Sequence, residues 1–88
     1  MVSKKFTVIS AEGLHLRTAG ILAGEMCKYD CNAEILYKGN IINAKSLLNI
    51  MAACIKCGDE IDFQCDGIDE KEAIKKAEEL IQSDFIIV

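Results

Sequence analysis

The spacing of apolar residues changes repeatedly along this chain, and this change is the feature that most constrains its fold. A spacing of two is typical of strands with one buried face, whereas spacings of three and four are typical of helices. Apolar and polar residues alternate over Val2–Ile9 and Glu60–Asp66, which predicts two strands. Two further strand patterns, Ala33–Tyr37 and Ile41–Asn43, flank Lys38-Gly39-Asn40 and predict a β-hairpin.

Helical spacing first predicts a helix from about Leu16 to Tyr29, stopped by Asp30-Cys31-Asn32. Gly20 and Gly24 share a stripe of this helix, and each costs about 1 kcal/mol relative to alanine. We therefore expect a neighbouring element to pack closely against that stripe. The predicted apolar face comprises Ala19, Leu22, Ala23, Met26 and Cys27.

Two further helices are predicted. A short helix, Leu47–Ala53, follows Ser46, a residue suited to the N-cap position. A final helix begins at the capping-box-like segment Asp69-Glu70-Lys71-Glu72. The element order β-α-β-β-α-β-α predicts a two-layer α+β domain with the helices on one face of a mostly antiparallel sheet. The buried face of the last helix is predicted to contain Ala73, Ile74, Ala77, Leu80 and Ile81.

Length and composition exclude several classes of protein. With 88 residues, the chain is expected to form one domain, residues 1–88. Its apolar runs, such as Phe85–Val88, are far shorter than the roughly 20 residues of a membrane span. A formal net charge of −4 argues against a nucleic-acid-binding surface, which needs clustered basic residues. The first ten residues do not resemble a secretory signal, because Thr7 and Ser10 interrupt the apolar stretch, so we expect a cytoplasmic protein.

The chain has five cysteines, an odd number that argues against a disulfide scaffold. The spacings Cys27-x3-Cys31 and Cys54-x2-Cys57 leave a four-sulfur zinc site as an alternative. Cys65, however, alternates with polar residues in a predicted strand, where cysteine acts as a small hydrophobic residue. We therefore favour reduced thiols and expect neither a metal nor another cofactor.

The single histidine, His15, lies between the first predicted strand and the first predicted helix. Imidazole is a nitrogen nucleophile that titrates near neutral pH. The backbone N–H groups at a helix start bind anions, and Arg17 adds forked donors suited to phosphate oxygens. These residues indicate transient phosphorylation on the histidine. The alternative is an exposed loop histidine with no such role.

Ser46 also allows two interpretations. As an N-cap, its hydroxyl needs no further role, whereas phosphorylation would place a dianion at the start of the short helix. Leu47, Leu48 and Met51 follow it in the sequence. Because so short a helix cannot bury every apolar side chain, we expect Leu48 and Met51 to be partly exposed. In the alternative, all three belong to the core.

Two separate segments, Gly13–Ala19 and Ala44–Met51, together resemble the HPr family of histidine-containing phosphocarriers. These proteins serve the bacterial phosphoenolpyruvate-dependent sugar phosphotransferase system. The resemblance extends over essentially the whole chain and includes the Lys38-Gly39 hairpin and the terminal helix. It implies an open-faced β-sandwich, a four-stranded antiparallel sheet covered on one face by three helices.

The resemblance also implies a phosphoryl carrier that is a substrate rather than an enzyme. His15 would accept a phosphoryl group from enzyme I as a pros-phosphohistidine and donate it to sugar-specific IIA proteins. Arg17 would stabilise the phosphate, together with the backbone amides of Leu16 and Thr18 at the helix start. We expect a monomer.

Regulation and partner binding are implied as well. Ser46 matches the family's regulatory serine, which HPr kinase/phosphorylase phosphorylates in many bacteria. The implied partner surface comprises Leu47, Leu48, Met51 and Gly20. An alternative is an HPr-like regulatory protein that binds partners, such as a transcriptional regulator, through the Ser46 helix and transfers little phosphate.

The chain departs from the family pattern beside the histidine. Family members usually have a small residue after the histidine and a proline after the arginine, where this chain has Leu16 and Thr18. We expect Leu16 to add bulk beside the phosphate site, and Thr18 to offer its N–H and hydroxyl to the phosphate. Cys54 replaces the usual glycine near the end of the short helix, which in this fold approaches the histidine loop. A redox influence of Cys54 on phosphotransfer is therefore a hypothesis.

Overall fold

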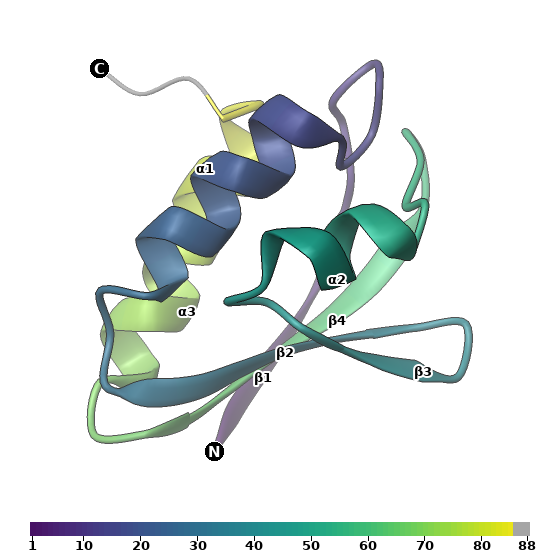
Figure 1. Cartoon of the computed structure of the whole chain (residues 1–88). Helices are drawn as coiled ribbons and strands as arrows, with labels where there is room; N and C mark the ends of the chain where they lie inside the picture. Colours follow the sequence, from purple (N-terminus) through teal and green to yellow (C-terminus); the bar gives the residue numbers. More distant parts are fainter. Residues whose placement is uncertain (86–88) are drawn as a thin grey trace.

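Four strands form one antiparallel sheet in the order β1-β4-β2-β3, and three helices cover one of its faces (Figure 1). This computed structural model describes residues 1–85, so most of the apolar run Phe85–Val88 lies outside the described residues. The arrangement confirms the predicted α+β open-faced sandwich. The elements are β1 (Val2–Thr7), α1 (Leu16–Met26), β2 (Cys31–Tyr37), β3 (Asn40–Asn43), α2 (Leu47–Ala52), β4 (Glu60–Gly67) and α3 (Glu70–Gln82).

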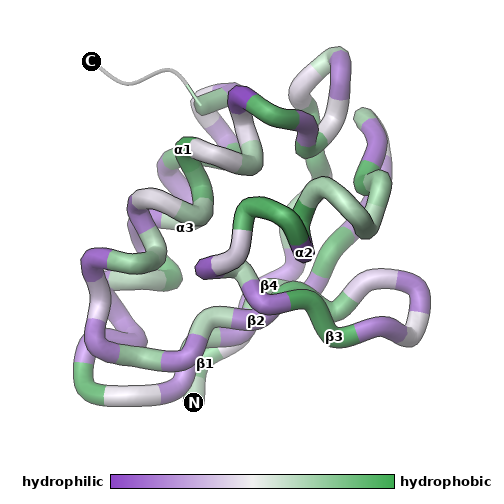
Figure 2. Tube along the Cα trace, viewed as in Figure 1, coloured by the Kyte–Doolittle hydropathy of each residue, from purple (hydrophilic) through white to green (hydrophobic). Residues whose placement is uncertain are grey.

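Strand β4 lies between β1 and β2, and its alternating residues decide which side chains enter the core. Phe63 pairs in register with Ile35 of β2, and its ring centroid lies 6.1 Å from that of Phe6 on β1. All three side chains are buried. The intervening positions are polar, as the colour changes along the strands in Figure 2 show. The predicted faces of β4 are therefore confirmed.

The helices bury one stripe each against the sheet and each other. Helix α3 packs on β1, β4 and β2, and α1 packs on α2 and α3. The prediction of Ile74 as a core residue needs a small change, because this side chain is only partly buried. Among residues 1–85, no helix is long and apolar enough to cross a lipid bilayer. The buried residues of α1 and α3 are Thr18, Ala19, Leu22, Ala23, Met26, Ala73, Ala77, Leu80 and Ile81.

The end of α1 differs from the prediction. The helix ends at Met26. The Cys27 N–H still donates to the carbonyl four residues back, and the next two N–H groups donate three residues back, as in Tyr29 N–H to the Met26 carbonyl. Cys27 is the C-cap residue and its thiol is exposed, so its predicted place on the buried face is wrong. Cys31 and Asn32, which were expected to stop the helix, already pair with β4 as the first residues of β2.

The expected close packing against the glycine stripe of α1 is also wrong. A Cβ built at Gly20 or Gly24 would meet no atom within 4 Å. Gly24 is exposed and Gly20 only partly covered, so this stripe faces away from the rest of the fold. The neighbours of α1 lie along its other face, where the bulky side chains are.

Helix α3 begins as predicted, but without a capping box. Asp69 is the N-cap, yet its carboxylate accepts the backbone N–H of Asp30 at 2.7 Å instead of a helical N–H. Glu70 accepts the N–H of Gly67 at 3.2 Å. These carboxylates therefore join the start of α3 to the turns before β2 and after β4. Strand β1 is also shorter than predicted, because Val8 leaves the strand although its side chain stays buried.

Candidate functional site

The loop between β1 and α1 is held by two backbone hydrogen bonds and by a close approach of Gly13 to Ile55. The N–H of Gly13 donates to the Ser10 carbonyl at 2.9 Å and closes a turn, and the N–H of Leu14 donates to the Ile55 carbonyl at 3.0 Å. Gly13 has φ +71°, and a Cβ there would lie 2.2 Å from the Ile55 oxygen. Only glycine therefore allows this approach. The segment after α2 abuts the histidine loop, as expected.

His15 is the N-cap of α1, with an extended backbone conformation. The first bond of the helical ladder runs from the Ala19 N–H to the His15 carbonyl, at 2.7 Å. The N–H groups of Leu16 and Arg17 precede this bond and have no acceptor inside the helix, whereas the Thr18 N–H faces the His15 side chain in a capping box. The imidazole thus lies at the end of α1 that carries partial positive charge.

Thr18 holds this loop from inside the fold. Its hydroxyl donates to the Gly13 carbonyl at 2.9 Å and accepts the His15 N–H at 3.1 Å, and the residue is fully buried. The expectation that this hydroxyl binds phosphate is therefore wrong, since its one proton is already donated to the Gly13 carbonyl. Leu16 lies on the surface with 64% of its area exposed, where a docking partner can reach it.

His15 and Arg17 line the same hollow, of about 140 Å³, together with two carboxylates that the sequence analysis missed. Glu12 Oε2 lies 3.3 Å from His15 Nε2. Asp84, just beyond α3, accepts a hydrogen bond from the Ser10 hydroxyl. The three-residue spacing of Glu12 and His15 was visible in the sequence. Nothing local indicated Asp84, because the contact joins residues 74 positions apart.

Ser46 is the N-cap of α2, and its Oγ accepts the N–H of Asn49 at 3.3 Å. Leu47 is partly buried against the core, whereas Leu48 and Met51 expose 78% and 37% of their areas. The predicted partial exposure of Leu48 and Met51 is confirmed, and the alternative that all three are core residues is wrong. Because α1 packs on α2, these side chains lie on the helix beside the one that His15 begins.

The cysteines fall into two groups. Cys31 and Cys65 are buried on β2 and β4, and burial, with Cys31 as the neighbouring thiol, raises the pKa of Cys65 to about 12. This confirms Cys65 as a small hydrophobic residue. Cys27, Cys54 and Cys57 carry exposed thiols. Within residues 1–85, no group of three or more His, Cys, Asp or Glu side chains is placed to hold a metal ion.

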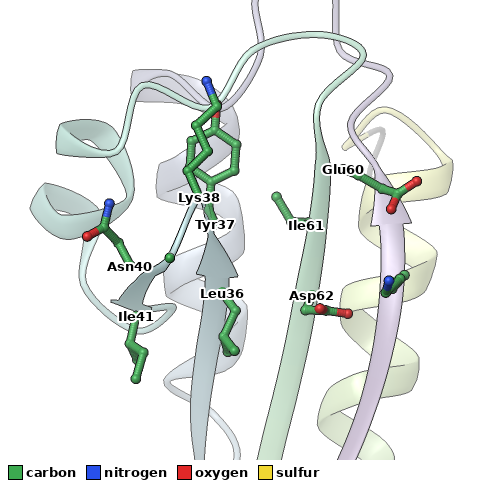
Figure 3. Close-up of a pocket in the computed structure, with 10 residues that line it drawn as sticks. Leu36, Tyr37, Lys38, Asn40, Ile41, Glu60, Ile61 and Asp62 are labelled. Atoms are coloured by element: carbon green, nitrogen blue, oxygen red, sulfur yellow. The ribbon is translucent and has the colours of Figure 1, made fainter.

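A second hollow, of about 490 Å³, lies on the open face of the sheet beside the β2–β3 hairpin (Figure 3). Its lining includes Lys5, Leu36, Ile41 and Asp62, one residue from each strand. It includes none of the predicted site residues. The candidate site is thus the smaller hollow at the start of α1.

Comparisons with known proteins agree with this fold and site. The family model described as "PTS HPr component phosphorylation site" matches residues 2–83. The phosphocarrier protein HPr of Mycoplasma capricolum is 42% identical over 73 residues, which cover 81% of this chain and 82% of that protein. The HPr structure from Thermoanaerobacter tengcongensis superimposes with a TM-score of 0.94 at 29% identity, covering 97% of this chain and 96% of that one.

A further similar structure is Crh, the catabolite repression protein of Bacillus subtilis, which was solved as a domain-swapped dimer. It has a TM-score of 0.76 and 28% identity, and covers 99% of this chain and all of that one.

The family match, together with a histidine at the start of the first helix of an open-faced sandwich, places this chain in the class of phosphocarrier proteins. The family model spans nearly the whole chain, and the Mycoplasma relative covers four fifths of it. The chain belongs to the HPr family of the phosphotransferase system.

Proposed function

We propose that the chain accepts a phosphoryl group on Nδ1 of His15 from enzyme I and donates it to sugar-specific IIA proteins in the cytoplasm. The observation that carries this proposal is the position of His15. It caps α1, with 35% of its side chain exposed, and shares a hollow with Arg17. A nucleophile that must meet two successive partners has to be reachable from solvent.

The chemistry follows from that position. The lone pair of Nδ1 attacks phosphorus, and the N–P bond forms as the bond to the donor breaks and its electron pair returns to the donor. Arg17 and the N–H groups of Leu16 and Thr18 stabilise the negative oxygens. On delivery, the acceptor attacks phosphorus and the electron pair of the N–P bond returns to Nδ1.

We propose that Leu48 and Met51 of α2, with Leu47 beneath them and Gly20 on α1, form the docking surface for both partners. The two exposed side chains supply apolar area, and Gly20 allows a partner to approach α1 closely. A carrier must release each partner quickly, so a small interface of modest affinity suits this role.

We propose that Ser46 is a regulatory phosphorylation site for HPr kinase/phosphorylase. Its Oγ would attack the γ-phosphorus of ATP, with ADP leaving and the hydroxyl proton passing to a base of the kinase. The hydroxyl is partly exposed and makes one weak capping bond, so the fold can tolerate the modification. The added dianion would lie next to the docking surface and change partner affinity.

A second candidate function is regulation through the Ser46 helix with little phosphotransfer. The structural similarity to Crh and the exposure of Leu48 support it. The two candidates differ in one measurement, which is the transfer of phosphate from the labelled chain to a IIA protein. Transfer supports the carrier, and a labelled chain that keeps its phosphate in the presence of IIA supports the regulator.

The decisive experiment incubates the chain with enzyme I and labelled phosphoenolpyruvate and tests for an acid-labile phosphoryl adduct. We expect the wild type to be labelled and His15→Ala to remain unlabelled, with an unchanged unfolding midpoint as the control for folding. An unlabelled wild type, or equal labelling of His15→Ala, would refute the carrier role. For Ser46, ATP and the kinase should give an acid-stable adduct that Ser46→Ala abolishes.

A further inference from the structure

The turn before His15 holds a carboxylate against the imidazole. Glu12 Oε2 lies 3.3 Å from Nε2 of His15, within hydrogen-bonding distance. The turn that carries Glu12 is closed by the hydrogen bond from Gly13 N–H to the Ser10 carbonyl. The Ser10 hydroxyl donates a second hydrogen bond to the Asp84 carboxylate. These bonds fix the backbone of the turn, while the Glu12 side chain is 77% exposed and reaches the imidazole from the surface.

We propose that Glu12 is a positioning residue for phosphoryl transfer: its carboxylate accepts the Nε2–H of His15 and so keeps the nucleophilic lone pair on Nδ1. This inference rests on the proposed function of His15. A neutral imidazole carries one proton, on either Nδ1 or Nε2, and the other nitrogen keeps a lone pair. A carboxylate can only accept a hydrogen bond, so the contact favours the form protonated at Nε2.

The contact between Glu12 and His15 also assists the second transfer, in which the phosphoryl group leaves His15 for the acceptor protein. When the N–P bond breaks, the electron pair returns to Nδ1, and a proton on Nε2 makes the leaving group a neutral imidazole rather than an anion. By holding that proton, Glu12 favours departure of the phosphoryl group to the acceptor as well as its arrival. Both steps therefore need the same tautomer.

Arg17 and Asp84 also line the hollow, so one positive and one negative side chain lie near the Glu12–His15 pair. Arg17 opposes the repulsion between the Glu12 carboxylate and the incoming phosphoryl group, whereas Asp84 adds to it and is engaged by the Ser10 hydroxyl. Because Glu12 is largely exposed, water screens its interaction with His15. An exposed pair of this kind biases the tautomer equilibrium by roughly two- to five-fold.

The test uses the fact that His15 is the only histidine in the chain. All imidazole ¹⁵N signals of the labelled protein therefore belong to this ring, and the couplings of each nitrogen to the ring protons give the ratio of the two tautomers directly. Spectra are recorded at a pH where the ring is neutral, alongside the rate of phosphorylation by enzyme I and phosphoenolpyruvate. Glu34→Ala is the matched control, since Glu34 is an exposed carboxylate of β2 on the open face of the sheet.

We expect Glu12→Ala to reduce the Nε2–H to Nδ1–H ratio by about two- to five-fold. The phosphorylation rate should fall in proportion to the fraction of molecules that carry the proton on Nε2. Glu12→Gln, whose amide oxygen still accepts a hydrogen bond, should restore part of both. Glu34→Ala should change neither. An unchanged ratio in Glu12→Ala would overturn the proposal, as would a rate that does not follow the measured Nε2–H fraction, or equal slowing by Glu34→Ala. The tautomer measurement needs no phosphate donor, so an unlabelled wild type would instead refute the carrier role.

Discussion

Replacing Thr18 with valine tests whether its hydroxyl holds the histidine loop. Valine keeps the shape of the side chain but removes the bond to the Gly13 carbonyl (2.9 Å) and the bond from the His15 N–H (3.1 Å). Each hydrogen bond contributes about 1 kcal/mol, and a buried carbonyl left without a partner costs about 1–3 kcal/mol. Because Gly13 is buried and the His15 N–H lies closer to water, we expect a loss of roughly 2–3 kcal/mol.

Urea and thermal unfolding measure this loss. For a domain of this size, it corresponds to a fall in the midpoint of about 10–20 °C, or roughly 1–2 M urea. Thr18→Ser keeps the hydroxyl and loses one buried methyl group, so it should cost only about 1 kcal/mol. A free energy of unfolding for Thr18→Val within about 0.5 kcal/mol of wild type, or equal losses in the two variants, would refute the reasoning.

Thr18→Pro introduces the residue that HPr proteins usually have at this place. The Thr18 N–H precedes the first helical bond, so proline is tolerated in this turn. Its fixed φ restricts the unfolded chain and so stabilises the fold by about 0.4–1 kcal/mol. The two hydrogen bonds of the Thr18 hydroxyl are lost, as they are in Thr18→Val. We therefore expect a stability between those of wild type and Thr18→Val. A variant less stable than Thr18→Val would contradict this expectation.

Three other outcomes are expected. Gly24→Ala should raise the free energy of unfolding by about 0.5–1 kcal/mol, because its Cβ meets no neighbour, and a loss in thermal unfolding would contradict that. The Tyr37 hydroxyl, then the Lys56 N–H, lowers the pKa of Asp59 below its ordinary value of 3.8. The ionised carboxylate stabilises the fold at pH values above 3.8, and this contribution is lost as the pH falls through the lowered pKa. The free energy of unfolding of Tyr37→Phe in urea should therefore depend less on pH below about pH 4. Identical acid profiles would contradict the Tyr37–Asp59 contact. A thiol reagent should label the native chain quickly at three cysteines and reach the other two only after denaturation, and fast native labelling of Cys65 would contradict its burial.

Much of the fold was predictable because side-chain direction follows local backbone geometry. Along β4, alternation alone placed Ile61, Phe63 and Cys65 on the helix side, where they are buried. The position of His15 ahead of a helix was likewise visible from its neighbours. Boundaries were less predictable: Cys27 has the spacing of a buried residue, but α1 ends at Met26 and the Cys27 thiol lies on the surface.

The amino-acid sequence by itself determined the order of the elements, their buried faces and the histidine with its arginine, because each depends on residues a few positions apart. Only the tertiary structure decided what surrounds the histidine. The Ile55 carbonyl lies close to Gly13, and the Asp84 carboxylate accepts a hydrogen bond from Ser10. The Thr18 hydroxyl donates its proton to the Gly13 carbonyl inside the loop. Such contacts join segments far apart in the chain or compete for one hydroxyl, so they exist only once the helices have packed on the sheet.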